Sequence, residues 1–289
     1  MPLSADDIKN LHPYEIRILH ALERMMRRHS WVPEDDLKMA VHLSAVETNY
    51  RVGSLIQRGM VRSDSVPYKG YALVFKGYDA LALFSLAQQK SISALGFMIG
   101  VGKESEIYEA RGCGIVVLKL HKVGQRSFQT VRINREYMPE HGHCPWIFAS
   151  AKSAKREYEA LKALNGKLNV PVPINQNRHV IVMSLIPGVS LHRSRLEDPG
   201  AVWQDILAQV KVAYDAGYIH GDLSEYNIMH DGAVLWIIDW PQWTTPEHPN
   251  ATAALRHDLE TVSAFFAKKY QRIYDVDEAI RFVTSGKVD

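Results

Sequence analysis

The stretch from His220 to Asn227 and the apolar run that ends at Asp239 constrain this chain more than any other part of it. They read His-Gly-Asp-Leu-Ser-Glu-Tyr-Asn and Trp-Ile-Ile-Asp-Trp. Taken singly, Asp and Asn favour turns and the ends of strands. Together they supply what phosphoryl transfer needs, one oxygen acceptor to orient the attacking group and two oxygen ligands for magnesium. We therefore predict that Asp222 is the catalytic residue and that Asn227 and Asp239 bind the metal.

The composition is that of a water-soluble globular protein, and 289 residues suffice for two domains with separate cores. No run of about 18 apolar residues occurs, so no transmembrane helix and no membrane partner is predicted. Residues 1–7 have neither a basic start nor an apolar core, so we expect no signal peptide and a cytoplasmic location. Two cysteines are too few for a disulfide framework, and a formal charge of +2 gives no overall attraction to nucleic acid.

Residues 1–90 are predicted to form a winged helix, in which a β-hairpin follows three helices. Apolar residues at helical spacing predict a helix over Glu15–Arg28, Pro33 begins a second helix, and a capping box at Ser44 begins a third. Two β-prone segments around Pro67-Tyr68-Lys69-Gly70 predict the hairpin, and Asp79–Gln88 is the closing helix. The buried side of the third helix is expected to use Val46, Tyr50 and Ile56.

The third helix and the hairpin of a winged helix are its usual contact surfaces, and here they carry Arg51, Arg58 and Lys69. These are our candidate contacts to nucleic acid, and the family resemblance described below adds the ribosome as a candidate partner. The charge of residues 1–90 gives little support, since 12 Lys and Arg stand against 10 Asp and Glu. Nucleic-acid binding and a role in docking a protein or bracing a kinase lobe therefore both remain open.

A glycine-rich turn at residues 100–105 is the candidate phosphate-binding loop. Glycine lets backbone N–H groups approach phosphates closely, although a G-x-G sequence alone is equally typical of a surface turn. Stronger support for a phosphate-binding site comes from the strands that follow. An apolar run there carries a lysine, which needs a carboxylate partner if it is buried. The predicted ATP contacts here are Gly100, Gly102, Lys103, Glu104, Ser105 and Lys119.

A helix predicted from Ala151 to about Leu164 supplies that carboxylate. Glu157 is spaced with Leu161 and Leu164 on the apolar face, whereas Glu159 points the other way. A surface ion pair would not explain a glutamate on the apolar side. We therefore predict that Glu157 pairs with Lys119, the arrangement that positions ATP phosphates in kinases.

The segment between that strand and that helix, Lys122–Ser150, is long and basic. From Lys119 to Arg156 there are eight Lys and Arg against two Glu. This excess is typical of a phosphate-seeking flap that contacts RNA, or of a solvated disordered loop. The candidates here are Arg126 and Arg132 as RNA contacts, Ser127 as an autophosphorylation site, and His141, His143 and Cys144 as a zinc set with no evident fourth ligand.

An apolar strand, Val180–Met183, leads into a turn that is predicted to join two lobes. Adenine binds such a hinge through backbone groups, and Ser184 and Ile186 are the candidates. Asp198 and the proline after it then begin a long helix that Gly217 ends. This helix delivers the chain to the catalytic stretch.

With these motifs placed, the chain resembles a RIO kinase, and the winged helix resembles the second branch of that family. The catalytic stretch is similar to the catalytic loop of protein kinases, with Gly221 where Arg is usual. The Gly-Lys-Glu-Ser loop and the Asp-(aromatic)-Pro-Gln ending are quite specific to this group. The resemblance implies an α+β fold with a winged helix at 1–90, a kinase N-lobe at 91–185 and a kinase C-lobe at 186–289.

The resemblance also implies a function, that of an atypical Ser/Thr protein kinase or ATPase which uses ATP with Mg²⁺, Mn²⁺ being a substitute. It implies a partner too, the small ribosomal subunit precursor with its rRNA and proteins. By position, Asp222 is catalytic, Asn227 and Asp239 hold metal, and Ser105 and Lys119 contact phosphates. Two residues depart from the pattern, Ser184 where an acidic hinge residue is common and Trp240 where Phe is common.

Pro241 follows Trp240 where ordinary kinases have glycine, and proline fixes φ and removes an N–H donor. The backbone flip that inactivates many kinases is therefore not expected. Only fifty residues follow Asp239, which leaves little room for helices that bind peptides. We hypothesise that the enzyme turns over ATP or phosphorylates itself, on an Asp through an aspartyl phosphate, rather than phosphorylating peptides in trans.

Two other readings compete. A small-molecule kinase of the aminoglycoside or choline type also uses His-Gly-Asp, a downstream Asn and Ile-Asp-Trp, but normally has a larger helical insertion. A winged-helix nucleic-acid binder with an inactive kinase scaffold is the second alternative. The sequence leaves the phosphoacceptor and the oligomeric state open. The inactive-scaffold alternative is disfavoured because the residues that a kinase needs are all present, namely Lys119, Glu157, Asp222, Asn227 and Asp239.

Overall fold

The computed structural model describes residues 4–66, 68–124 and 146–286. The chain divides into two compact units. The first comprises Met1–Lys155 and Ile174–Val182, and the second Arg156–Pro173 and Met183–Asp289. The N-terminal helices and most of the larger sheet therefore belong to a single unit. None of the described helices combines the length and the apolar character needed to cross a bilayer.

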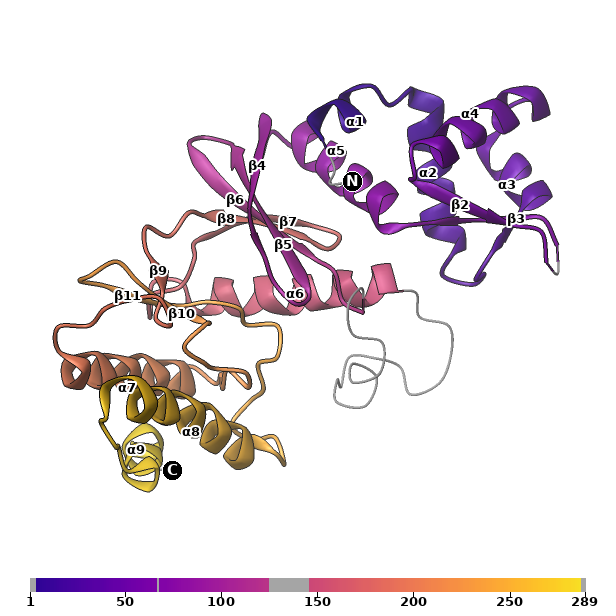
Figure 1. Cartoon of the computed structure of the whole chain (residues 1–289). Helices are drawn as coiled ribbons and strands as arrows, with labels where there is room; N and C mark the ends of the chain where they lie inside the picture. Colours follow the sequence, from indigo (N-terminus) through magenta and orange to yellow (C-terminus); the bar gives the residue numbers. More distant parts are fainter. Residues whose placement is uncertain (1–3, 67, 125–145, 287–289) are drawn as a thin grey trace. The chain divides into compact units, whose positions relative to one another are not determined.

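The first unit begins with the helices and the hairpin expected of a winged helix (Figure 1). Helix α2 contacts α3, α4 and α5, and the small sheet has the order β1-β3-β2. The predicted capping at Ser44 is confirmed, since its side chain accepts a hydrogen bond from the Glu47 amide. The elements are α1 (Ala5–Lys9), α2 (Pro13–Met25), β1 (Val32–Pro33), α3 (Glu34–Val41), α4 (Ala45–Gln57), β2 (Val61–Asp64), β3 (Gly70–Leu73) and α5 (Phe75–Gln88).

The predicted buried face of α4 is wrong at Val46 and Tyr50, whereas the third predicted residue, Ile56, is partly buried against the core. Val46 and Tyr50 are 81% and 67% exposed, whereas Thr48, Val52 and Leu55 are buried. Two positions along a helix differ by about 200° in direction, so these two sets lie on opposite faces. Both sets have helical spacing, and the sequence does not say which of them meets the core.

The larger sheet has the order β4-β5-β6-β8-β7. Strands β6 and β8 were predicted from their apolar character, and β5 from a strand-like stretch at Glu106–Ala110 before a glycine-rich turn. Strands β4 and β7 were not, because β4 is interrupted by glycines and largely exposed, and β7 is polar. The bounds are β4 (Ala94–Val101), β5 (Ser105–Arg111), β6 (Ile115–His121), β7 (Pro173–Asn177) and β8 (Val180–Ser184).

The winged helix and the larger sheet share one hydrophobic core. Leu81 and Leu86 of α5 belong to the same buried cluster as Leu118 of β6 and Val180 of β8. Burying this apolar surface is the main favourable contribution to folding. Helix α5 is therefore a core element of the sheet as well as the closing helix of the winged helix.

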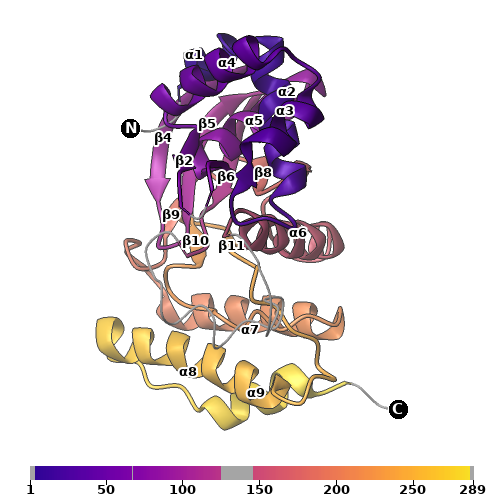
Figure 2. The same cartoon turned by 90° about the vertical axis from the view of Figure 1, so that its right-hand side faces the viewer.

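The second unit contains a three-stranded sheet of order β11-β10-β9, the C-terminal part of α6 and the helices α7, α8 and α9. Helix α7 begins at the predicted cap, where the Asp198 carboxylate accepts hydrogen bonds from two backbone amides. Helices α7, α8 and α9 lie side by side in both views (Figures 1 and 2). The bounds are α6 (Trp146–Leu164, which begins in the first unit), β9 (Val189–Ser190), α7 (Pro199–Asp215), β10 (Ile228–His230), β11 (Leu235–Ile237), α8 (Ala251–Tyr270) and α9 (Val276–Thr284).

Candidate active site

A β-hairpin brings the two predicted metal ligands together. Strands β10 and β11 pair antiparallel, with Ile228 opposite Ile237, so Asn227 before β10 and Asp239 after β11 lie at the same open end. The Ile238 amide donates to the Asn227 carbonyl at 2.9 Å and extends the ladder by one more bond. The residues between Asn227 and Asp239 thus form a hairpin that brings the two positions to the same end.

The Asn227 side chain is held in one orientation. Its Nδ2 donates to the backbone carbonyl of Asp222 at 2.8 Å, which leaves Oδ1 as the acceptor end of the amide. The Asn227 amide also donates to the Ser224 carbonyl at 2.9 Å, which closes the turn after Asp222. An amide oxygen beside carboxylates is the hard oxygen set that Mg²⁺ prefers, so the residues present fit the predicted metal.

Asp239 has φ 68°, in the left-handed region that non-glycine residues seldom adopt. Behind it, Trp240 is 1% exposed, its Nε1 donates to the Ile237 carbonyl at 3.0 Å, and its ring lies 4.6 Å from that of His220. The larger ring that stands where Phe is common therefore has a bonded N–H and a packed face. A residue in a sparsely populated conformation persists only where its surroundings fix it.

A buried carboxylate holds the catalytic stretch and was missed by the sequence analysis. Asp258 of α8 is 1% exposed, and its two oxygens accept hydrogen bonds at 2.8 Å from the amides of Gly221 and Leu223, on either side of Asp222. Burial raises the pKa of Asp258, while His220 and the two amide bonds oppose that rise. The only signal in the sequence was an aspartate within a helix otherwise rich in apolar residues.

His220 links the catalytic stretch to the hairpin between Asn227 and Asp239. Its Nε2 donates to the Ile238 carbonyl at 2.9 Å, and its Nδ1 accepts from the Asp222 amide at 3.3 Å. These partners assign the proton to Nε2, because a carbonyl can only accept. His220 therefore positions Asp222 and the residue before Asp239 at once.

Gly221 replaces the usual arginine for a steric reason. Its φ is +78°, and a Cβ at this position would lie 2.7 Å from the Gln242 carbonyl oxygen. A side chain would need both a strained backbone and a displaced segment after Asp239. The departure from the protein-kinase pattern is therefore built into the packing.

The glycine-rich loop lies in the first unit, between β4 and β5. The Gly102 amide donates to the Ser105 carbonyl at 2.8 Å, and a Cβ on Gly102 would lie 2.9 Å from the Ser105 hydroxyl. The Glu104 carbonyl accepts from the Lys122 amide at 2.7 Å. Lys119 lies on β6 and is 6% exposed, as predicted for a lysine carried inwards by an apolar strand.

Helix α6 presents the predicted glutamate to its buried side. Glu157 is 1% exposed and Glu159 is exposed, which confirms the assignment of faces. Lys119 and Glu157 belong to different units, so their ion pair stays a prediction.

Ser184, at the predicted hinge, is bonded to the residue immediately before β7. Its amide donates to the Val172 carbonyl at 3.0 Å, and its hydroxyl accepts from the Val172 amide at 3.0 Å. The Ser184 amide is therefore already hydrogen-bonded within the protein. Adenine contacts at Ser184 and Ile186 stay predictions.

The three predicted nucleic-acid contacts of the winged helix all form internal ion pairs. Their partner distances are 2.7 Å for Arg51 with Glu47, 3.1 Å for Arg58 with Glu15, and 2.7 Å for Lys69 with Glu34. Arg126, Arg132, Ser127 and the His141, His143 and Cys144 set lie outside the described residues.

A buried ionic cluster in the first unit was also missed. We call Asp79, Lys122 and His179 the α5 cluster. Asp79 of α5 binds the Lys122 ammonium and, at 2.7 Å, the Nε2 of His179. Burial lowers the pKa of His179 to about 4, and the bond to Asp79 only partly offsets this, whereas Lys122 and His179 hold the pKa of Asp79 below its usual value against its burial.

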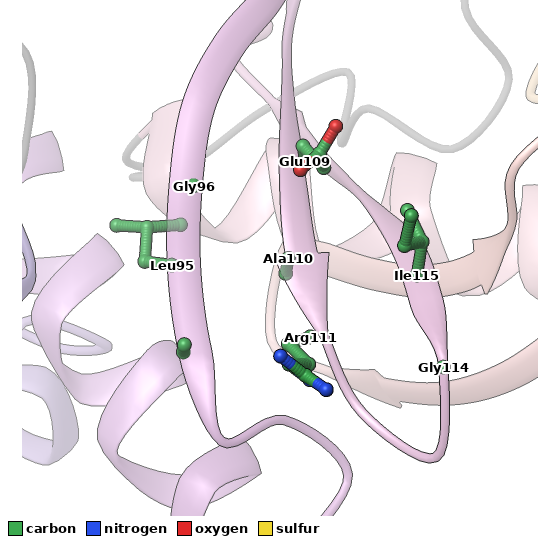
Figure 3. A pocket seen from close by; sticks show the side chains of 8 residues that line it. Leu95, Gly96, Glu109, Ala110, Arg111, Gly114 and Ile115 are labelled. Carbon is green, nitrogen blue, oxygen red and sulfur yellow. The ribbon is translucent and has the colours of Figure 1, made fainter.

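An open depression of about 420 Å³ lies at the other end of the strands from the glycine-rich loop (Figure 3). The start of β4, the end of β5 and the start of β6 form it, with Glu109 and Arg111 at its rim. None of the predicted ATP contacts lines it.

Comparison with known proteins agrees with this geometry. The sequence model of the RIO domain matches residues 106–279, and that of the Rio2 N-terminal domain matches residues 8–89. The chain belongs to the RIO kinase family. Among curated members, the RIO-type serine/threonine-protein kinase Rio2 of Methanocaldococcus jannaschii is 36% identical over 90% of this chain and all of its own length. The kinase rio2 of Schizosaccharomyces pombe is 31% identical over 95% of this chain and 81% of its own length.

This RIO-family kinase is also similar to solved structures. The Rio2 kinase of Chaetomium thermophilum, in a crystal structure described as an ADP/Mg²⁺-phosphoaspartate complex, matches with a TM-score of 0.84 at 29% identity. The match covers 99% of this chain and 91% of that one. The fold is thus a winged-helix domain followed by a RIO kinase domain, and the chain is a RIO-type serine/threonine-protein kinase of the Rio2 branch.

Proposed function

We propose that this RIO-family kinase binds ATP with Mg²⁺ and acts chiefly as an ATPase that passes through a phosphorylated Asp222. The observation that carries the proposal is the hairpin geometry, in which the Asn227 amide is locked to the Asp222 carbonyl beside Asp239. The phosphoaspartate of the related C. thermophilum structure supports the same chemistry.

The roles follow from the positions. Asn227 Oδ1 and the Asp239 carboxylate would hold Mg²⁺, which neutralises charge on the phosphates. Lys119 and the loop from Gly100 to Ser105 would bind phosphate oxygens. Asp222 is exposed while its flanking amides are fixed by Asp258, so its carboxylate is presented on a rigid backbone.

The proposed step balances as a substitution at phosphorus. An Asp222 oxygen forms a bond to the γ-phosphorus, the bond to the bridging oxygen breaks, and ADP leaves with that electron pair. Water then attacks the phosphorus of the acyl phosphate, which releases inorganic phosphate and restores the carboxylate. Peptide transfer would require a hydroxyl to take the place of that water.

Steady-state turnover tests this proposal. We expect Mg²⁺-dependent ATP hydrolysis to exceed phosphate transfer to generic peptides, because the acceptor is the enzyme's own carboxylate. A hydroxylamine-sensitive phosphoryl label should appear on the wild type and be absent from Asp222→Asn, and Asp239→Ala should lose Mg²⁺-dependent nucleotide binding. Efficient peptide phosphorylation with negligible ATP hydrolysis would overturn the proposal. Measuring ATP hydrolysis with Mn²⁺ in place of Mg²⁺ shows whether the site accepts the larger ion.

For its partner, we propose the small ribosomal subunit precursor, met in the cytoplasm. The support is the basic stretch from Lys119 to Arg156, because clustered cations bind rRNA phosphates with a strong salt dependence. Within it, Lys119, Lys122 and Arg156 are assigned above to other contacts, so the candidates for rRNA are Arg126 and Arg132. Arg51, Arg58 and Lys69 have carboxylate partners, so they support the proposal less.

Co-sedimentation with precursor particles, with and without ATP, measures this association. We expect binding to fall steeply with salt and to weaken in an Arg126→Gln, Arg132→Gln variant. Arg51→Gln serves as the winged-helix comparison. Binding that does not change with salt and is not weakened in the Arg126→Gln, Arg132→Gln variant would count against an rRNA contact through this segment.

A further inference from the structure

The segment that follows Asp239 is held from two sides within the second unit. On one side, Thr244 exchanges backbone hydrogen bonds with Ile219 at 2.8 and 2.9 Å, which ties the segment to the residue before His220. On the other side lies Arg156 of α6. The residues after the metal ligand are thus fixed between the catalytic stretch and α6.

Arg156 makes an unusually complete set of contacts. Its Nε donates to the Pro241 carbonyl at 3.2 Å, its Nη2 donates to the Trp243 carbonyl, and its guanidinium lies 4.7 Å from the centre of the Trp243 ring. In return, the Trp243 Nε1 donates to the Arg156 backbone carbonyl at 3.0 Å. We call Arg156, Pro241 and Trp243 the α6 latch.

Only an arginine satisfies this geometry. Its planar fork reaches two carbonyls two residues apart and stacks on an aromatic ring at once, whereas a lysine is a single flexible point charge. The bonded carbonyls belong to residues two and four positions after Asp239, and Asp239 itself has a left-handed φ. The latch therefore acts on the backbone that sets the direction of the Asp239 side chain.

We propose that Arg156 is a positioning residue for the Asp239 metal site, acting through Trp243 and not through contact with the metal. Glu157, the next residue on α6, is the predicted partner of Lys119. The latch thus joins the helix that carries Glu157 to the segment that carries Asp239, and a displacement of one moves the other. The inference deepens the Mg²⁺ role proposed above and rests on it.

The test is a Mg²⁺ titration of ADP binding to the full chain. Groups that orient metal ligands typically change metal affinity by 10- to 100-fold when they are removed. We expect Arg156→Gln to weaken the Mg²⁺ dependence of ADP binding by about that factor, with ADP binding in the absence of metal nearly unchanged. Arg156→Lys should recover little of the loss, because lysine cannot bond both carbonyls and stack.

Trp243→Phe keeps the ring and removes the donor to the Arg156 carbonyl, so we expect it to shift the same titration by a smaller factor. The double variant should be no worse than Arg156→Gln, because both substitutions break one latch. Lys162→Gln on the same helix, exposed and beside Tyr158, controls for lost charge on α6 and should leave the titration unchanged.

The outcomes separate the two proposals. A wild type with no Mg²⁺-dependent ADP binding removes the proposed metal role itself. A wild type that binds Mg²⁺ and ADP, with Arg156→Gln titrating identically, leaves that role intact and overturns the latch. If Arg156→Gln does not fold, Arg156→Lys and Trp243→Phe decide by the same measure. A lowered melting temperature with an unshifted Mg²⁺ titration also counts against the latch, because it shows a merely structural contact.

Discussion

At the scale of single residues, the catalytic stretch is positioned mainly by groups that do no chemistry themselves. Asp258 holds the amides on both sides of Asp222, and His220 bonds to the residue before Asp239. Each of these side chains hydrogen-bonds backbone groups of the stretch, and the Leu223 amide, which is buried, would cost about 1–3 kcal/mol if left without a partner. Catalytic geometry here depends on buried polar contacts as much as on the predicted oxygen ligands.

Gly221→Ala should impair the enzyme more than its backbone strain alone explains. The added methyl would meet the Gln242 carbonyl, within the segment between Asp239 and Trp243. Gly217→Ala is a matched control, since Gly217 has φ +90° and open space around its Cβ position. We expect both variants to lose about 1–2 kcal/mol of unfolding free energy from the left-handed φ, and Gly221→Ala alone to lose ATP turnover by more than tenfold. Chemical denaturation and steady-state kinetics measure the two effects, and equal turnover in both variants would contradict this account.

At the scale of elements, the sequence predicted what depends on short-range patterns. Strand β11, the cap at Asp198 and the buried face of α6 follow from apolar spacing and end signals, and the structure confirms them. Val46 and Tyr50 of α4 were predicted to be buried but are exposed. Two sets of residues at helical spacing cannot be told apart by the sequence until a neighbouring element covers one of them. Asp258, Asp79 and Arg156 were missed because their partners lie 35 or more residues away, and no local signal reports such a distance.

The α5 cluster makes a prediction about acid stability. The folded protein keeps His179 neutral down to about pH 4, whereas an unperturbed histidine takes up a proton near pH 6.5. Because the unfolded state binds more protons between these values, the unfolding free energy should fall as pH falls from 6.5 to 4, by up to about 1.4 kcal/mol per pH unit from this group. Asp79 adds a further loss only below its ordinary pKa of 3.8.

Denaturant unfolding at a series of pH values measures this slope. His179→Gln keeps a donor for Asp79 but does not titrate, so its slope in the window should be shallower than that of the wild type. His29→Gln removes a histidine that is not buried and should keep the wild-type slope. Parallel slopes for the wild type and His179→Gln would show that the buried imidazole does not control acid stability.

At the scale of the whole molecule, the winged helix and most of the larger sheet form one compact unit. Their side chains share a core, and the Asp79 carboxylate of α5 neutralises Lys122 at the end of the strand that carries Lys119. Family comparison describes two domains here, residues 8–89 and 106–279, whereas packing places the first of them and this sheet in one compact unit. The domains defined by sequence and the compact units defined by packing therefore differ in this protein.

That difference matters for how truncations are interpreted. A chain shortened to begin after α5 would remove the Asp79 carboxylate from Lys122 and His179, and it would expose to water the apolar side chains of the sheet that α5 covers. Strand β6, which carries Lys119, would then lack part of the hydrophobic core that supports it. If such a deletion abolished catalysis, the cause would be a destabilised first unit. The result would carry no information about what the deleted residues bind.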